Sequence, residues 1–295
     1  MILPNSSPVL ADVIEQIVFE LTKIGISNPI FEARQLVIDA TTICSKDFIL
    51  QPQMKLVKSQ MATISAWLER RKSGESLARI RGWQEFYGRK FVLSSETLEP
   101  RSDSETLIDV ALQIMEMKRG PRHAWRILDI GTGTGCLILT LLAERSNATA
   151  VGVDICSEAL VIAQKNAIHL GLESRVTWLQ SDYLKKVNGQ FDLLISNPPY
   201  IKSQDISSLQ IEIVNHDPRL ALDGGPDGLN AYRSLAADLK RVVPQGFAVF
   251  ESACNDTDRV IEILKTGENH NFLKLVSVNQ DLTGCKRCVV LETIS

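Results

Sequence analysis

The chain has 295 residues, of which 44% are hydrophobic and 23% are charged, a balance that excludes a largely disordered protein. The net charge of −3 and the pI near 5.9 argue against a protein that holds nucleic acid on a broad basic surface. No apolar run approaches the ~20 residues that cross a bilayer, so we expect no membrane partner.

The N-terminal sequence and the cysteines indicate the cellular compartment in which the protein is found. The first residues lack the basic start and apolar core of a signal peptide, so we expect a cytoplasmic protein, with a bacterial cytoplasm as the simplest setting. Several of the six cysteines lie in apolar runs, which favours small buried side chains in a reducing compartment. Cys285 and Cys288 form a lone C-x-x-C without a second pair, so we expect no metal site.

Residues 1–77 are predicted to form a helical bundle. Apolar residues from Leu10 to Ile24 recur at three- and four-residue spacing, which predicts one helix that ends at Gly25. Asn28 and Pro29 then supply an N-cap and a first-turn proline for a second helix. Further helical stretches between residues 54 and 71 complete this first domain.

Residues 78–95 have a different composition. Aromatic and β-branched residues around Gly82 and Gly88 predict a β-hairpin that links the bundle to the rest of the chain. Basic residues also gather between Arg70 and Lys90. A solvated surface is the favoured interpretation of these charges, and a patch that grips phosphate is the alternative.

Residues 96–295 alternate short apolar strands with segments of helix length. Strands are predicted at residues 126–130, 150–154, 175–179, 191–196 and 247–251. This alternation predicts an α/β fold with a Rossmann-like, mostly parallel sheet. The last two predicted strands, residues 272–278 and 287–292, are joined by a link too short for a parallel crossover, so the last strand is expected to be antiparallel.

A glycine-rich loop follows the first of these strands, in the order Gly131, Thr132, Gly133, Thr134 and Gly135. Glycines let the backbone approach a bound ligand closely, but the G-x-G-x-G spacing differs from the G-x-G-x-x-G of dinucleotide sites. This difference weakens the alternative of a nicotinamide-dependent dehydrogenase. Asp154, at the end of the next strand, is placed to accept hydrogen bonds from ribose hydroxyls. Asp182 and Tyr183 would bind an adenine amine and ring, and the alternative is that Asp182 caps a turn while Tyr183 packs against the protein.

Asn197, Pro198, Pro199 and Tyr200 directly follow the predicted strand FDLLIS, at the strand end where ligands of open α/β sheets bind. The prolines cannot donate backbone hydrogen bonds, which leaves the Asn197 side chain and the Pro198 carbonyl as acceptors. Two acceptors would hold both N–H groups of an amide or amino nitrogen and aim its lone pair at the methyl of S-adenosylmethionine. Tyr200 would supply a flat wall against which the plane of the substrate rests. A simple turn signal is the alternative interpretation.

These segments together resemble the release factor glutamine methyltransferases, the HemK/PrmC family. The resemblance covers nearly the whole chain and includes GWQEFYGRKFVLS, ILDIGTGTG, FDLLISNPPYI, HDPRLALDGGPDGLNAYR and DLTGCKRCVVLE. It implies that the chain methylates the side-chain amide of the glutamine in the Gly-Gly-Gln motif of peptide chain release factors, which modulates translation termination. The methyl donor would be S-adenosylmethionine, with S-adenosylhomocysteine as the product.

The resemblance also assigns residues to roles. Gly131 to Gly135, Asp154 and Tyr183 would hold the cofactor, and Asn197 to Tyr200 would hold the glutamine, with Asn197 touching both ligands. The N-terminal domain would help to dock the protein substrate. The chain departs from the family pattern where Arg101-Ser102-Asp103-Ser104-Glu105 replaces Arg-Pro-Glu-Thr-Glu, and again at Ser252 and Ala253, which follow Glu251.

Two alternatives remain at this stage. The first keeps the chemistry and changes the acceptor to an exocyclic amino group of adenine or guanine in RNA or DNA, because the Asn-Pro-Pro-Tyr loop is shared with such methyltransferases. The second is a non-catalytic binding module on the same fold. For the favoured function we expect a monomer that binds no nucleic acid stably.

Overall fold

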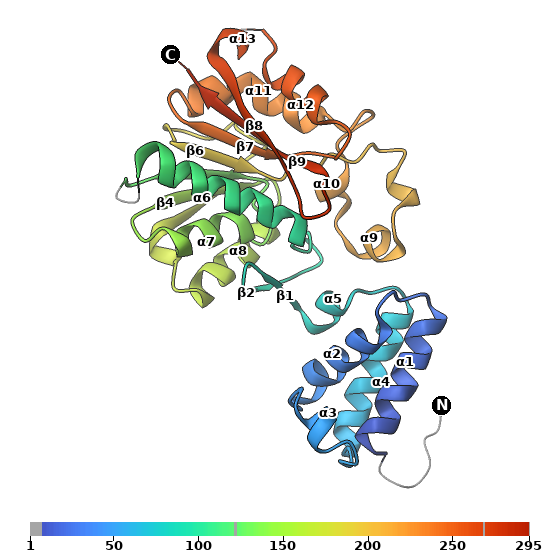
Figure 1. Cartoon of the computed structure of the whole chain (residues 1–295). Helices are drawn as coiled ribbons and strands as arrows, with labels where there is room; N and C mark the ends of the chain where they lie inside the picture. The colour runs from blue at the N-terminus through green and yellow to red at the C-terminus, as the bar shows by residue number, and fades with distance from the viewer. Residues whose placement is uncertain (1–7, 121–122, 268, 295) are drawn as a thin grey trace. The chain divides into compact units, whose positions relative to one another are not determined.

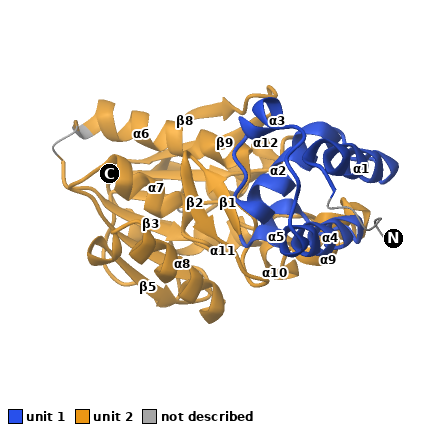
Figure 2. Ribbon diagram, turned by 90° about the horizontal axis from the view of Figure 1, so that it is seen from below, with its two compact units in different colours: residues 1–82 blue, residues 83–295 orange. Residues whose placement is uncertain are grey.

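The structure, a computed structural model, describes residues 8–120, 123–267 and 269–294. The chain divides into two compact units, with the boundary between Gly82 and Trp83 (Figure 2). Within the described ranges, no helix combines the length and the apolar character that crossing a membrane requires.

The first unit is helical, as predicted. Its helices are α1 (Leu10–Lys23), α2 (Pro29–Thr41), α3 (Asp47–Leu50), α4 (Lys58–Lys72) and α5 (Leu77–Arg81). The expected cap of α2 is present, because the Asn28 side chain accepts a hydrogen bond from the Phe31 N–H at 3.4 Å. The apolar stripe of α1 is buried against α2 and α4, and its members are Leu10, Val13, Ile17 and Leu21.

The hairpin is shorter than the sequence indicated. Strands β1 (Trp83–Phe86) and β2 (Arg89–Val92) pair antiparallel, but the preceding residues form α5 rather than a strand. The Ser76 hydroxyl caps this helix by accepting from the Arg79 N–H, and Gly82 ends it with a φ of 82°. The link expected at residues 78–95 therefore begins at residue 83 in the structure.

Most basic side chains between Arg70 and Lys90 have acidic partners. Each partner lies in the same unit as its cation, in the first unit for Arg70, Arg71, Lys72 and Arg81 and in the second for Arg89. The pairs are Arg70 with Glu75, Arg71 with Glu32, Lys72 with Glu69, Arg81 with Asp39, and Arg89 with Glu144.

The second unit contains a seven-stranded sheet of order β5-β4-β3-β6-β7-β9-β8. The strands are β3 (Arg126–Ile130), β4 (Thr149–Asp154), β5 (Val176–Gln180), β6 (Leu193–Ser196), β7 (Phe247–Glu251), β8 (Leu273–Gln280) and β9 (Lys286–Thr293). Strands β3 to β7 are parallel and β9 is antiparallel to both neighbours, which confirms the predicted sheet. The chain order reverses beside β3, and ligands bind at such a switch point.

Helices cover both faces of the sheet (Figure 1). One face carries α6 (Glu105–Arg119), α7 (Cys136–Glu144) and α8 (Ser157–His169), and the other carries α11 (Asn230–Val242), α12 (Thr257–Leu264) and α13 (Asn269–Phe272). Short helices occupy the connections: η1 (Ser102–Ser104), η2 (Glu173–Arg175), η3 (Ile206–Ser208), α9 (Ile211–His216) and α10 (Arg219–Leu222). Two buried apolar clusters, one under each helix layer, hold the strand ends in place.

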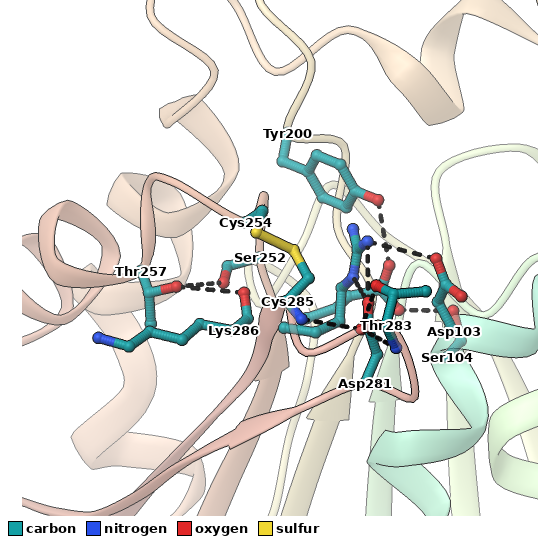
Figure 3. Close-up of polar contacts among 12 residues, drawn as sticks. Asp103, Ser104, Tyr200, Ser252, Cys254, Thr257, Asp281, Thr283, Cys285 and Lys286 are labelled. Carbon is teal, nitrogen blue, oxygen red and sulfur yellow. Dashed lines mark hydrogen bonds and ion pairs between the residues drawn. A yellow bond between two sulfur atoms is a disulfide. The ribbon is translucent and has the colours of Figure 1, made fainter.

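The cysteines differ from expectation. Among the free cysteines only Cys288 is buried, whereas several were expected to be, and Cys254 and Cys285 form a disulfide that joins the loop after β7 to the loop before β9 (Figure 3). The local apolar pattern could not reveal this pair, because its members are 31 residues apart. Over the described part of the chain, no group of three or more His, Cys, Asp or Glu is placed to hold a metal ion.

Candidate active site

The glycine loop after β3 depends on backbone conformations that favour glycine. Gly131, Gly133 and Gly135 have φ values of 73°, 53° and 79°. A Cβ on Gly133 would meet no atom within 4 Å, so this glycine faces open space. A Cβ on Gly135 would lie 3.0 Å from the Leu139 side chain, which shows that this glycine serves the packing of α7.

The two threonines of the loop face the protein interior. The Thr132 hydroxyl donates to Asp129 Oδ2 at 2.7 Å, and the Thr134 carbonyl accepts from Asn166 at 2.9 Å. Burial raises the pKa of the Asp129 carboxyl to about 7. Of the five loop residues expected to hold the cofactor, Gly131 and Gly133 line the cavity described below, and the other three do not line it.

Asp154 ties the glycine loop to the end of β4. Its Oδ2 accepts from the Gly133 N–H at 2.9 Å and its Oδ1 accepts from the Cys156 N–H at 3.0 Å. Burial raises the pKa of Asp154, while these N–H groups act to lower it. Each oxygen keeps acceptor capacity for a further donor, because a carboxylate offers about four lone-pair sites.

Asp182 and Tyr183 lie beside this carboxylate. Tyr183 has a φ of 47°, an uncommon backbone conformation for a tyrosine, and such strain gathers at ligand sites. Asp182 forms an ion pair with Lys185 at 2.5 Å, and both side chains are substantially exposed. Both predicted residues therefore reach the same cavity, although Asp182 already has a partner.

A cavity of about 270 Å³, here called the glycine-loop cavity, is lined by Gly131, Gly133, Asp154, Asp182 and Tyr183, among other residues. It lies at the carboxyl ends of the parallel strands, where the fold predicts a ligand. Sequence reasoning missed further wall residues: Leu98 from the segment before η1, Pro218 directly before α10, and Leu220 and Ala221 within α10.

The Asn197–Tyr200 loop, which follows β6, is fixed by two polar contacts. Asn197 Nδ2 donates to the Ser104 hydroxyl at 3.1 Å, and the Tyr200 hydroxyl donates to Glu251 Oε1 at 3.1 Å. Burial raises the pKa of the Tyr200 hydroxyl, with the Glu251 carboxylate as a further cause. Tyr200 therefore stays protonated and serves as a hydrogen-bond donor.

Tyr200 lines a second cavity of about 100 Å³, here called the Tyr200 cavity. Its walls are Leu98, Arg101, Asn197, Tyr200, Ile201, Ile213, Ala221, Leu222 and Glu251. Three of these residues, Leu98, Asn197 and Ala221, also line the glycine-loop cavity. Asn197 thus stands at the junction of two cavities, an arrangement suited to group transfer between two ligands.

The prolines of the loop differ in position. Pro199 lines the glycine-loop cavity, whereas Pro198 is buried and is absent from the walls of both cavities. The structure therefore places Asn197, Pro199 and Tyr200 on the cavity walls. Any contact of the buried Pro198 with a ligand would be made through its backbone carbonyl.

Glycines after α10 support this loop from behind. The Ile201 N–H donates to the Leu222 carbonyl at 3.0 Å, and the Gly224 N–H donates to the Ile201 carbonyl at 2.8 Å. A Cβ on Gly228 would lie 2.5 Å from the Tyr200 carbonyl oxygen, and a Cβ on Gly224 would lie 2.8 Å from another carbonyl of the loop. The sequence analysis did not assign this supporting role. The three glycines of DGGPDG, residues 223–228, were the feature that could have indicated it.

We expect Gly228→Ala to destabilise the protein and to reduce turnover. The residue has a φ of 80°, which costs about 1–3 kcal/mol with a side chain, and the new methyl group would push Tyr200 away. Gly171→Ala is the matched control, because Gly171 has a φ of 68° but open space around it. Denaturant unfolding should show a loss in both variants, and turnover should fall by about tenfold only for Gly228→Ala. Equal turnover in the two variants would contradict the supporting role.

The Rossmann-like sheet and the two cavities that meet at Asn197 define a methyltransferase of the α/β class. Residues 103–238 match the family model described as the methyltransferase small domain, and residues 12–82 match the PrmC N-terminal domain. The release factor glutamine methyltransferase of Agrobacterium fabrum is 43% identical over 225 residues, which cover 76% of this chain and 78% of that protein. The chain belongs to the release factor glutamine methyltransferase family.

Further relatives agree with this assignment. The release factor glutamine methyltransferase of Rhodospirillum rubrum is 35% identical over 287 residues, which cover 97% of this chain and 86% of that protein. A solved protein-(glutamine-N5) methyltransferase (release factor-specific) from Alicyclobacillus acidocaldarius aligns with 66% of this chain over 94% of its own length, at 22% identity. Its TM-score of 0.40 is too low to add to the assignment.

Proposed function

We propose that this protein transfers a methyl group from S-adenosylmethionine to the side-chain amide nitrogen of the glutamine in the Gly-Gly-Gln motif of peptide chain release factors. The observation that carries the proposal is the position of Asn197, which lines both the glycine-loop cavity and the Tyr200 cavity. A transfer reaction needs its two ligands in contact, and these two cavities share Asn197 as a wall residue. The names of the relatives support the choice of acceptor.

The glycine-loop cavity fits S-adenosylmethionine. Gly131 and Gly133 leave room for a ligand against the backbone, and Asp154 keeps acceptor capacity for the ribose hydroxyls. Tyr183 offers an aromatic wall for the adenine ring, and Asp182 an acceptor for its amine. The bound cofactor supplies a methyl group on a sulfonium, which makes this carbon electrophilic.

The Tyr200 cavity would hold the glutamine side chain. Asn197 Oδ1 and the Pro198 carbonyl accept the two amide N–H groups, which fixes the nitrogen and turns its lone pair toward the glycine-loop cavity. These acceptors bind more strongly as the nitrogen gains positive charge. Tyr200 contributes a wall rather than a base, because its hydroxyl stays protonated and donates to Glu251. Leu98 and Ile213 give the cavity apolar walls.

We propose that the protein acts as a monomer, without a metal and without stable nucleic-acid binding. Most cations between Arg70 and Lys90 form ion pairs with carboxylates, which leaves less charge for phosphate. A nucleic-acid acceptor would require steep salt dependence of binding, and this provides the test between the two acceptors.

We expect methylation at a single glutamine when the protein is incubated with S-adenosylmethionine and an unmethylated release factor. Mass spectrometry would locate the added methyl group. A release factor whose Gly-Gly-Gln glutamine is replaced by alanine is the matched control and should remain unmodified. Methylation of bulk RNA or DNA, with the release factor unmodified, would contradict the proposed substrate and retain the transfer chemistry.

A further inference from the structure

A buried carboxylate lies behind the Asn197–Tyr200 loop, at the end of β7. Glu251 is 2% exposed, and its two oxygens accept from two different side chains. Oε2 accepts from the Ser104 hydroxyl at 2.5 Å, and Oε1 accepts from the Tyr200 hydroxyl at 3.1 Å. A carboxylate at this depth is stable only when its oxygens have such partners, so the arrangement has a cost that a purely structural residue would avoid.

The Glu251 carboxylate determines the direction of the hydrogen bonds that reach Asn197. Burial raises the pKa of Glu251, while the Ser104 hydroxyl, the Arg287 charge and the Tyr200 hydroxyl act to lower it. The ionised carboxylate only accepts, so Ser104 gives its single hydroxyl proton to Glu251. The Ser104 oxygen then has only lone pairs left for Asn197, which must present its NH₂ group. The structure agrees, because Asn197 Nδ2 donates to the Ser104 hydroxyl oxygen at 3.1 Å. The amide oxygen is thereby turned the other way. Without these two hydrogen bonds, the two orientations of the Asn197 side-chain amide, which exchange its oxygen and nitrogen, would be hard to distinguish.

We propose that Glu251 and Ser104 are positioning residues that hold Asn197 with its amide oxygen toward the acceptor and hold Tyr200 as a wall of the same cavity. This inference rests on the proposed function of the loop. Neither residue takes part in bond making. Glu251 acts through Ser104 on Asn197 and directly on Tyr200. Ser104 lies directly before α6, whereas Tyr200 belongs with Asn197 to the loop after β6; Figure 3 labels Ser104 and Tyr200.

An arginine from β9 anchors the segment that carries Ser104. Arg287 pairs with Asp103 at 3.2 Å and with Asp281 at 3.2 Å, and its charge also acts on Glu251. Asp103 therefore reaches Arg287 although it is shorter than the acid of the usual family pattern, and Ser104 keeps a hydroxyl. The departure at residues 102–104 preserves the contacts that the positioning role needs.

The first test compares Ser104→Ala with Ser104→Thr. Loss of the hydroxyl should lower kcat by about tenfold, because the Asn197 amide can then rotate, while the KM for S-adenosylmethionine stays within about threefold. Threonine keeps the hydroxyl and should restore kcat to within about threefold of the parent. Circular dichroism and thermal unfolding would establish that both variants fold. Equal kcat values for the alanine and threonine variants would overturn the proposal.

A double-mutant cycle then asks whether Ser104 acts through Asn197. In the Asn197→Ala background, Ser104→Ala should cause no further loss of single-turnover rate, because the group that it positions is gone. A second tenfold loss in that background would show that Ser104 acts by another route. The same ratios can be measured on whichever acceptor the parent methylates, so a wrong acceptor would not be mistaken for a wrong positioning role.

A readout independent of activity completes the test. In ¹⁵N-labelled protein, the side-chain amide signals of Asn197, identified by their loss in Asn197→Ala, should include one proton that exchanges slowly with water. Ser104→Ala and Glu251→Gln should speed this exchange by about tenfold or more, because the acceptor is removed or its orientation is no longer fixed. Unchanged exchange in Ser104→Ala would overturn the proposal even if the protein proved inactive toward release factors.

Discussion

Asn197→Ala is expected to lower turnover by at least about 10²-fold, the scale for loss of one preorganised polar contact to a transition state. The substitution removes the acceptor that stands between the two cavities, and alanine offers no replacement. Turnover should be measured with saturating S-adenosylmethionine and release factor, so that a loss of kcat is separated from weaker binding. The loss should appear mainly in kcat, because the contact strengthens as charge develops on the nitrogen.

Asn188→Ala is the matched control for this substitution. Asn188 is an exposed asparagine of the same unit, and its side chain donates only to the nearby Lys186 carbonyl. Its loss should leave turnover near that of the parent. Near-normal turnover of Asn197→Ala would instead refute the role assigned to the Asn197 amide.

Asp154→Ala should weaken cofactor binding by about 10²-fold. A hydrogen bond to a charged group contributes about 1.5–3 kcal/mol, and this carboxylate would accept from ribose hydroxyls while it also holds the Gly133 N–H. Calorimetric titration with S-adenosylhomocysteine measures the affinity directly. Turnover at saturating cofactor should change much less, because the group lies away from the reacting nitrogen.

Asp182→Ala provides the comparison within the same cavity. Its carboxylate is partly exposed and already pairs with Lys185, so its removal should weaken binding by less than about tenfold. Asp154→Ala with the affinity of the parent would rule out the ribose assignment. Equal losses in the two variants would indicate that the cavity responds to charge alone.

Much of the fold could be predicted from local sequence patterns. The three- and four-residue spacing of apolar residues in α1 and the short apolar runs of β3 to β7 predicted the helical unit and the mostly parallel sheet, and the structure confirms both. These predictions succeed because periodicity reflects which face of an element is buried. The start of the hairpin was placed too early because α5 is only five residues long, which gives too short a pattern to recognise.

The candidate site could be predicted only in outline. The strand ends identified the glycine loop, Asp154 and Asn197, because ligands of this fold bind there. The sequence could not show that the Thr132 side chain faces Asp129 rather than the cavity, since a loop has no fixed side-chain period. The sequence predicted Tyr200 as a wall of the acceptor site but not the other walls, because these come from separate segments, among them α9, α10 and β7, that share no motif.

The sequence by itself determined the fold class, the family resemblance and the residues that surround the strand ends, because these depend on neighbours within a few positions. Only the tertiary structure decided how those residues are held. Ser104 bonds to Asn197 across 93 positions and to Glu251 across 147, and neither contact leaves a local pattern. The direction of these two hydrogen bonds follows from the single proton of the Ser104 hydroxyl beside the buried Glu251 carboxylate. It is set only when the fold has brought the three residues together.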